Sequence, residues 1–470
     1  MISNSSRKYF SGQVMPLTAV FLVIVSLSAV FLYNTSIVVS ERVKLQNTAD
    51  SVAFSVASVD ARYLNFMAYG NRAMIANHVI AAQAVGIASS GKMLNQTGQN
   101  AKKVLGKIPY YGTYYINALA IGLEYYSEGL DLYADVAIPI ANYTTQAISL
   151  AQQSYRATLP MVSTSLTQKL IAANDKHGEL HTMIALGHDK QLVSFLDTFD
   201  PDNSSSKAHK ERSDEFYKIT MNSRNKFSSA RSGDWGDGLK IPFVLEFHPV
   251  KYGGTDMSNG SSGPKSAKKY VTWAGMDTLS LSYRTFSCTN SWGIPKWCGY
   301  KEIPFGYGAG TAGKDYHFAK DKSKSLYGNG AWRNSNSASL QASMGKKYKN
   351  SDYDGMLEFL DIKQKGRVDS APTAFIALSK NESHIATGKS LGTFTDSVDI
   401  SEKGSLRKGQ QFALAKAAAY FERTQELDAS SLRSGSKREF GNLYNPFWVP
   451  KLQDSTASEA QSLMLLATGG

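Results

Sequence analysis

The stretch RVKLQNTADSVAFSVA (residues 42–57) decides the fold, because it continues a membrane-length apolar segment without a break. The preceding residues, Val14–Tyr33, carry no charge, and about twenty apolar residues in a helix can cross a bilayer. A simple anchor would give way here to a loose polar linker. Residues 42–57 instead hold helix-forming residues with regularly spaced apolar side chains. The sequence therefore predicts a helix that continues from the membrane into a folded region.

Apolar residues recur at seven-residue spacing along this segment. They are Val38, Leu45, Val52, Val59, Phe66, Ala73, Ile80 and Ile87, widened by Ala49, Val56, Tyr63 and Ala84. The pattern predicts one long amphipathic stalk helix, packed against partner helices, against this chain's own bundle, or both. We expect its interface to consist of Leu45, Ala49, Val52, Val56, Val59 and Phe66. Gly and polar residues in 92–111 are expected to interrupt the stripe.

Basic residues before the span predict its direction. Arg7 and Lys8 favour a cytoplasmic N-terminus, which places the bulk of the chain outside the cytoplasm. A cleaved secretory signal is the alternative. The apolar run is too long for one, and SLSA (residues 26–29) is a poor cleavage site. We therefore expect a single-pass membrane protein, in contact with lipid through Val14–Tyr33.

The expected fold class is α+β. The predicted order is a cytoplasmic tail (1–13), a transmembrane helix (14–35) and a helical stalk and bundle (36–200). A linker or exposed loop (201–239) and a β-rich domain (240–470) follow. Helical patterns return after residue 112, and Pro139 and Pro160 are expected to kink or separate these helices. Strand-length apolar runs separated by Gly, Ser and Lys follow residue 240.

Two cysteines, Cys288 and Cys298, lie close together in SCTNSWGIPKWCGY (residues 287–300). Gly and Pro between them suit a hairpin, so the spacing predicts a disulfide. A disulfide requires an oxidising compartment, which agrees with the predicted membrane orientation.

The net charge of +12 is unevenly distributed. Residues 1–200 hold 14 Lys+Arg and 12 Asp+Glu, and residues 201–470 hold 37 and 27, a distal excess of +10. Such an excess can attract anionic polymers. No basic run carries interleaved aromatic residues, so we expect a solvated surface and no nucleic-acid partner.

Two motifs suggest chemistry only on first inspection. GAGTAGKD (308–315) matches part of a phosphate loop, but Asp315 stands where Ser or Thr would bind magnesium, so a glycine-rich loop is expected. His177, His181 and His188 lack the Glu that a zinc-protease motif places after its first His, so structural histidines are expected. We expect no catalytic, cofactor-binding or metal-binding residue. Near the C-terminus, Tyr444, Phe447 and Trp448 could anchor an interface or plug the edge of their own domain.

Residues 12 to about 60 resemble the N-terminal region of TadE/TadG-like Flp (tight-adherence) pilus-assembly proteins. The shared features are a Gly-Gln start, an apolar span, and then Leu45, Gln46, Ala49 and Asp50 leading into alanine-rich helix. Looser similarity covers residues 302–313, 415–423 and 439–452. Some such proteins carry an adhesion domain with an Asp-x-Ser-x-Ser metal site, but DSTAS (454–458) has Thr at the middle position.

The resemblance implies an inner-membrane protein with a periplasmic domain in a Tad-type pilus or related secretion system. We therefore expect a non-enzymatic assembly protein whose partners are other pilus-assembly or envelope proteins, and also a second copy through the stalk. Two alternatives belong to other classes: a membrane-tethered periplasmic hydrolase, and a tethered binding module for an anionic envelope polymer.

Overall fold

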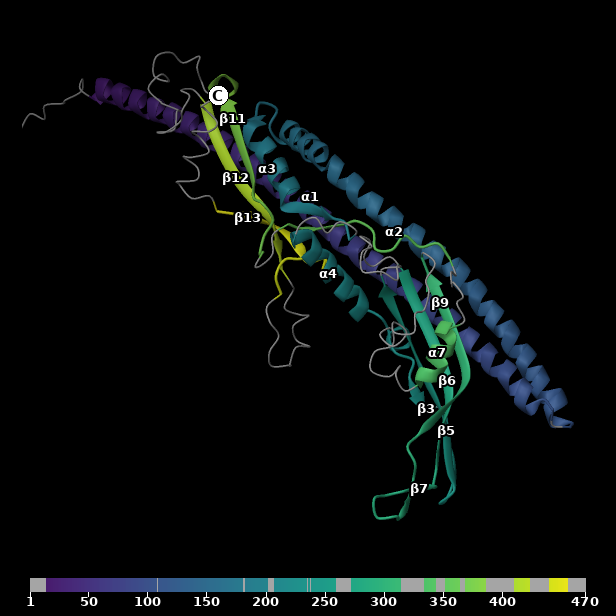
Figure 1. The fold of residues 1–470 in the computed structure, drawn as a ribbon. Coiled ribbons are helices and arrows are strands. Elements are labelled where there is room, and N and C mark those ends of the chain that lie inside the picture. Colours follow the sequence, from purple (N-terminus) through teal and green to yellow (C-terminus); the bar gives the residue numbers. More distant parts are fainter. Residues whose placement is uncertain are drawn as a thin grey trace, which may run out of the picture. The chain divides into compact units, whose positions relative to one another are not determined.

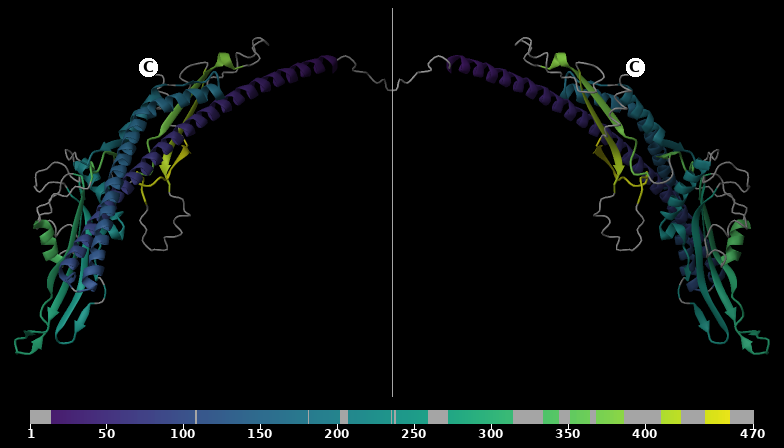
Figure 2. Two further views of the ribbon diagram at one scale, coloured as in Figure 1. Left: turned by 90° about the vertical axis from the view of Figure 1, so that its right-hand side faces the viewer. Right: turned by 90° about the vertical axis from the view of Figure 1, so that its left-hand side faces the viewer.

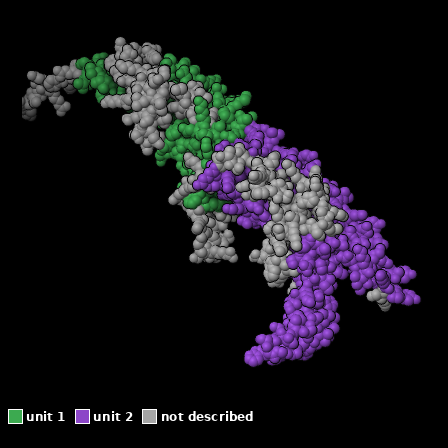
Figure 3. All heavy atoms as spheres, viewed as in Figure 1, with its two compact units in different colours: residues 1–65, 155–196, 362–470 green, residues 66–154, 197–361 purple. Residues whose placement is uncertain are grey.

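The structure of the protein is a computed structural model. The chain folds into two compact units (Figure 3). Unit 1 comprises residues 1–65, 155–196 and 362–470, and unit 2 comprises residues 66–154 and 197–361. The structure describes residues 14–107, 109–180, 182–201, 207–234, 236, 238–258, 272–313, 334–343, 351–363, 368–385, 410–422 and 439–454. Both long helices of the chain contribute residues to each unit. The division into a helical bundle and a distal β-rich domain stays a prediction.

One helix of 92 residues, α1 (Val14–Leu105), contains both the apolar span and the predicted stalk. Figures 1 and 2 draw it without a break. Pro16 falls in its first turn, where the missing N–H has no intrahelical partner to lose. The predicted continuation of the apolar segment into a long helix is confirmed. The Gly and polar residues after position 92 do not end the helix, which reaches Leu105.

The buried face of α1 follows an eleven-residue step rather than the predicted seven-residue step. Leu45, Val56, Met67, His78 and Ser89 are all buried. Seven residues of a straight helix fall about 20° short of two full turns, so a seven-residue series drifts around the helix. The later members of the predicted stripe accordingly leave the buried face: Val59 is half-buried, and Phe66 and Ile80 are exposed.

A second long helix returns along α1. After a short π-helix, η1 (Tyr111–Ile116), α2 spans Asn117–Asn174. In unit 2, Gly70, Gly91 and Gly98 of α1 face progressively earlier residues of α2, so the pair is antiparallel. Pro139 and Pro160 do not separate α2 into shorter helices. Each proline removes one backbone hydrogen bond, and the packed face of so long a helix can offset that loss.

Unit 1 is built on a four-stranded antiparallel sheet in the order β1-β11-β12-β13. Its strands are β1 (Glu179–Leu180), β11 (Ala374–Asn381), β12 (Gln410–Phe421) and β13 (Trp448–Gln453), and α3 (Thr182–Phe195) and the short η3 (Glu382–His384) complete the unit. The central strand β12 is alanine-rich, and its small side chains allow a helix to pack close to the sheet.

Unit 2 contains a sheet in the order β3-β5-β6-β9, with β4 also paired to β5. The bounds are β3 (Gly233–Asp234), β4 (Leu239–Ile241), β5 (Leu245–Ser258), β6 (Thr272–Thr285) and β9 (Lys301–Ala312). β6 and β9 pair with a register shift at Leu279/Ser280. Between them, β7 (Cys288–Thr289) and β8 (Pro295–Lys296) form a small hairpin.

The remaining elements are α4 (Lys207–Asn222), α5 (Lys226–Ser229), α7 (Ser335–Ser343), and the paired strands β2 (Leu196–Phe199) and β10 (Phe359–Ile362). Helix α4 lies in the range predicted to be a linker. Its apolar anchor Phe216 is fully buried and stacks on Phe359, with ring centroids 4.3 Å apart, which explains why this polar segment is ordered. The α+β class is confirmed.

Candidate interaction surfaces

The apolar start of α1 is the first surface. An 18-residue window within this helix has a mean hydropathy of 2.5, and none of it is buried in the protein. Val14–Tyr33 is therefore an exposed apolar segment of the length that a bilayer requires. It is the candidate membrane helix.

The predicted stalk interface is covered by the chain's own sheet in unit 1. Leu45, Ala49, Val52 and Val56 are buried against β11 and β12. The contacting sheet residues include Ile376, Leu378, Ala413, Ala415 and Ala417. Small side chains on both surfaces let the helix lie close to the sheet. This part of the stripe forms a core within the chain, whereas Val59 and Phe66 lie outside it.

Polar contacts fix the same helix on this sheet. Gln46 donates from Nε2 to the backbone oxygen of Leu414 at 3.0 Å and to Asp50 at 3.0 Å. Lys380 Nζ, which is buried, lies 2.6 Å from Glu41 and 3.1 Å from Asp175. Burial favours the neutral amine, but the two carboxylates outweigh it and raise the pKa of Lys380.

The two described histidines of the group, His177 and His188, have different partners. His188 is buried and lies 2.8 Å from Asp60 of α1, while His177 is exposed and stacks on His384 at a centroid distance of 4.1 Å. His181 lies outside the described residues. Within the described part of the chain, no group of three His, Cys, Asp or Glu side chains is arranged to hold a metal ion.

The glycine-rich stretch near residue 308 is a strand and not a loop. It forms β9, whose Gly306 and Gly308 lie against α1 within unit 2. A Cβ at Gly308 would collide with backbone atoms of Met93 and Ser89, and one at Gly306 would lie 2.9 Å from the Met93 carbonyl oxygen. These glycines therefore serve close helix–sheet packing. For residues 308–312 the expectation of a glycine-rich loop was wrong, because the close approach of the helix backbone is not visible in the motif. Lys314 and Asp315 of the motif lie outside the described residues.

A buried ion pair fastens α1 to the sheet of unit 2. Arg231 Nε lies 2.8 Å from Asp277, and both side chains are almost completely buried. Ser89 of α1 donates a short hydrogen bond to the other carboxylate oxygen of Asp277. Burial lowers the pKa of nearby Lys251, although Asp277 acts in the opposite direction. A paired and hydrogen-bonded charge of this kind orients the elements that it joins.

Farther along unit 2, His78 of α1 contacts the same sheet through Tyr353. The indole N–H of Trp273 can only donate and lies 3.2 Å from the Tyr353 hydroxyl, which leaves the hydroxyl proton for His78 Nδ1 at 2.6 Å. Complete burial lowers the pKa of His78 to about 4, so the imidazole is neutral at pH 7. Burial also raises the pKa of Tyr353.

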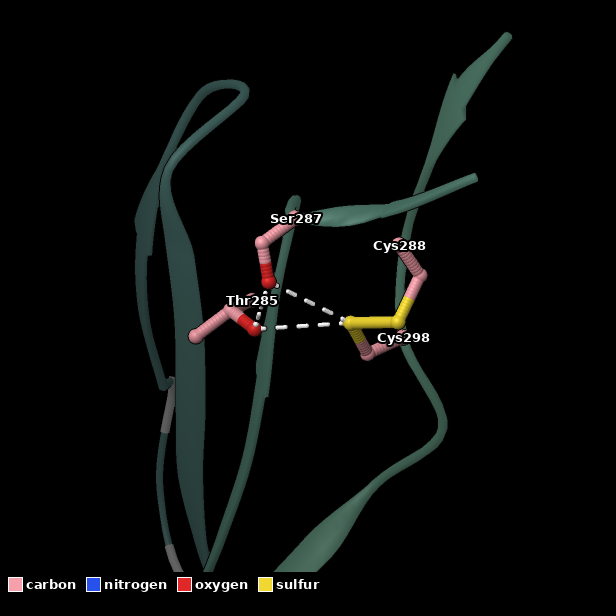
Figure 4. Close-up of a disulfide and its surroundings, with 4 residues drawn as sticks. All are labelled: Thr285, Ser287, Cys288 and Cys298. Carbon is pink, nitrogen blue, oxygen red and sulfur yellow. Dashed lines mark hydrogen bonds between the residues drawn. A yellow bond between two sulfur atoms is a disulfide. The ribbon is translucent and has the colours of Figure 1, made fainter. Parts of the chain in front are cut away.

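The finger of unit 2, defined as residues 239–247 and 283–301, carries the predicted disulfide. Cys288 and Cys298 are joined, and Figure 4 shows their position beside Thr285 and Ser287, whose hydroxyl groups lie 3.5 and 3.4 Å from Cys298 Sγ. The ten-residue separation makes this a small closed loop that resists unfolding of the finger.

The finger presents a ridge of exposed apolar side chains. Trp292 is 86% exposed, and the exposed neighbours on the finger are Leu239, Ile241, Phe243, Val244, Ile294 and Tyr300. Arg284 stabilises their support: it lies over the rings of Trp297 and Tyr300 at 5.0 and 4.7 Å and binds Glu246 at 2.6 Å. Hydrogen bonding by Arg284 lowers the pKa of Glu246. Sequence reasoning identified the disulfide but missed this ridge, although two Trp inside the loop were a signal.

A further apolar surface follows the outer side of α2 in unit 2. Exposed Leu, Ile, Val and Tyr residues occur from Leu119 to Leu150. At the turn before α2, a hollow of about 840 Å³ is lined by Pro109, Tyr110, Tyr114, Tyr115 and Ala118. The sequence alone does not reveal this surface, because its apolar periodicity is equally typical of a buried face in a helical bundle.

The C-terminal aromatic residues divide between core and surface. Trp448 is 2% exposed, and its indole N–H donates to the Asn442 carbonyl oxygen at 3.1 Å. Asn65 of α1 bonds both backbone groups of Trp448 at 2.9 and 3.0 Å. Tyr444 and Phe447 are half-buried. Trp448 thus fills the edge of its own unit, one of the two roles considered from the sequence.

Comparison with known proteins supports the resemblance noted in the sequence. Residues 12–59 match the family model described as "Putative Flp pilus-assembly TadE/G-like". This segment contains the exposed apolar span and the part of α1 that packs on the sheet of unit 1. No curated protein matches the chain. No solved structure matches it either.

Proposed function

We propose that this chain is a membrane-anchored assembly protein of a Tad-type (Flp) pilus or related secretion system, acting through protein–protein contacts in the periplasm. One observation carries the proposal: a single helix begins as an exposed apolar segment and continues as a core element of a folded unit. The family match at residues 12–59 covers this transition. A continuous helix transmits position and orientation from the bilayer to the protein that it carries.

The orientation follows from charge and cysteine chemistry. Arg7 and Lys8 precede the span, which favours retention of the N-terminus in the cytoplasm. The Cys288–Cys298 disulfide belongs on the opposite, oxidising side of the membrane. Both features support a single-pass protein whose folded units lie in the periplasm.

The exposed surfaces of the protein favour a role in protein–protein assembly over a catalytic role. The finger presents Trp292 and its exposed neighbours on a support stiffened by a disulfide and by Arg284. Exposed aromatic side chains on rigid supports supply much of the binding energy at protein interfaces. We therefore assign the working role to surfaces of this kind, with no cofactor and no catalytic step.

The test is deletion of the gene in the source bacterium, followed by complementation and counting of surface pili. The complete chain should restore pili. Replacement of Val14–Tyr33 by an unrelated apolar helix of equal length should restore them as well, because the span serves as an anchor. A secreted form without the span, present at an equal level, should restore less than a tenth. Normal pili after deletion would overturn the proposal.

A further inference from the structure

The outer face of α2 carries a second apolar stripe with a seven-residue repeat. One series comprises Leu119, Tyr126, Tyr133, Ile140 and Ala147, and the series three residues later comprises Gly122, Gly129, Val136, Tyr143 and Leu150. In coiled-coil terms these are the a and d positions over about four heptads. None of the ten residues is charged. We call this set the outer stripe; all of it belongs to unit 2.

The large side chains of the outer stripe face solvent. The exposed fractions of Leu119, Tyr126, Tyr133, Val136, Ile140, Tyr143 and Leu150 lie between 47% and 67%. The opposite side of α2 already packs on α1, where Ala120, Ser127, Ala134, Ile138 and Ala141 are buried. A helix that is apolar on two opposite sides normally packs on both sides. The packing of α2 on α1 uses the other face of α2 and leaves the outer stripe uncovered.

The glycines in the stripe point to a helix as the occupant. A Cβ added at Gly122 or Gly129 would meet nothing within 4 Å, so neither glycine serves packing within the chain. Glycine inside a helix costs about 1 kcal/mol relative to alanine. At d positions beside Tyr126 and Tyr133, the two glycines leave holes flanked by large side chains. A second helix could place its own large side chains in these holes.

We propose that the outer stripe is the interface on which a second copy of this chain docks, helix α2 against helix α2. The stripe carries both large tyrosines and glycine holes. The tyrosines of one copy can therefore fill the glycine holes of the other. The inference goes beyond the proposed function and does not depend on it.

Charge also favours a second copy over a different partner. Coiled coils that select unlike partners do so with charges at the flanking e and g positions. Here those positions hold no charge: they include Ala118, Leu123, Tyr125, Leu130 and Leu132. The acidic residues of this segment, Glu124, Glu128, Asp131 and Asp135, fall at c and f positions, off the outer stripe. Of these, Asp131 lies 3.1 Å from Lys92 of α1, and Glu124 lies 3.4 Å from Gln99 of the same helix. Two copies can therefore approach without like charges meeting at the interface.

The available area is sufficient for a stable dimer. A tyrosine buries on the order of 150–250 Å² when covered, and half to two-thirds of that area is still exposed on each stripe tyrosine. With the aliphatic members, one face offers roughly 800 Å², which is what each partner contributes to a standard interface. This exceeds the apolar patches of a few hundred Å² that monomers commonly expose.

The test uses the complete chain in its native membrane, with one new cysteine and a bismaleimide crosslinker. The joined Cys288 and Cys298 do not react with maleimides. Tyr133→Cys, near the centre of the stripe, should give a dimer at twice the chain mass of 51.3 kDa. Glu128→Cys is the matched control: it is exposed on the same helix but off the stripe, and it should give less than a tenth of that dimer.

A second variant separates docking from folding. Gly122→Leu with Gly129→Leu fills both holes at positions where a Cβ meets nothing within 4 Å, and it improves helix propensity. We expect protease resistance to be unchanged and co-purification of two differently tagged copies to fall at least tenfold. Unchanged co-purification would overturn the proposal. So would a Tyr133→Cys chain that forms no dimer, or one that crosslinks only to a different protein or to lipid.

Discussion

Gly308 of β9 lies directly against the backbone of Met93 in α1. A side chain at this position would overlap backbone atoms of the helix, which cannot move aside as the end of a flexible side chain can. The long helix can therefore pack closely on the sheet of unit 2 only because residue 308 has no side chain. The alanines of β12 create a similar close seat for α1 in unit 1.

This relationship predicts that Gly308→Ala destabilises the protein strongly. Overpacking against an immobile neighbour costs about 1–3 kcal/mol, and backbone contact places this site at the upper end or beyond. The apparent melting temperature of the purified full-length protein measures the effect. Gly299→Ala is the control, because a Cβ there meets nothing within 4 Å, and it should be close to neutral. Equal effects at both positions would refute the packing argument.

The buried ion pair of unit 2 gives a second prediction. Asp277→Asn leaves Arg231 buried without its charge partner, and such changes cost about 3–5 kcal/mol. Glu246→Gln breaks the pair with Arg284, which is more exposed, and should cost much less, because solvent screens that pair. Chemical denaturation of the two variants side by side provides the comparison. A small loss for Asp277→Asn would mean that the ion pair does not hold α1 on the sheet.

Acid should weaken unit 2 through His78. The folded-state pKa of about 4 lies below the usual value of 6.5, so folding favours the neutral imidazole. Its contribution to stability is fully present above pH 6.5 and is lost as the pH falls toward 4. Between pH 7.5 and 5 the loss is about 2 kcal/mol.

The measurement is the pH dependence of thermal unfolding, compared with that of His78→Gln. The variant should be less stable at pH 7.5, because it loses the fitted contact with Tyr353, yet it should lack the extra loss between pH 6.5 and 5. Parallel pH curves for the two proteins would show that His78 does not titrate in this way.

The disulfide predicts both the compartment and the stability of the finger. In cells quenched with acid, a thiol reagent should label neither Cys288 nor Cys298 unless a reductant is added first. Replacing both by Ser should cost about 2–3 kcal/mol of resistance to local unfolding, seen as faster proteolysis within the finger. Free thiols in untreated cells would argue for the cytoplasmic side of the membrane.

The sequence was sufficient to predict α1, because an uncharged span followed by apolar residues at helical spacing has few other interpretations. The α+β class and the disulfide were predictable from local patterns as well. The burial of Leu45 and Val52 against a sheet was not, since their partners Ile376 and Ala415 lie more than three hundred residues away in the chain. The glycines of β9 were wrongly predicted to form a loop for the same reason. Their spacing resembles a loop motif, and the helix against which they pack is distant in the sequence. The finger ridge and the outer stripe were missed because apolar periodicity alone does not say which face is left uncovered.

The most direct test of the central claim, that this protein works through contacts with other assembly proteins, is crosslinking of the full-length chain in intact cells followed by mass spectrometry. The account predicts crosslinked peptides from other proteins of the same pilus system, with finger residues near Trp292 among the linked positions. It also predicts that Trp292→Ala with Ile294→Ser reduces those links, while a substitution at exposed Lys218 does not. Crosslinks that join the chain only to itself or to proteins unrelated to the pilus, in cells that are making pili, would contradict the account.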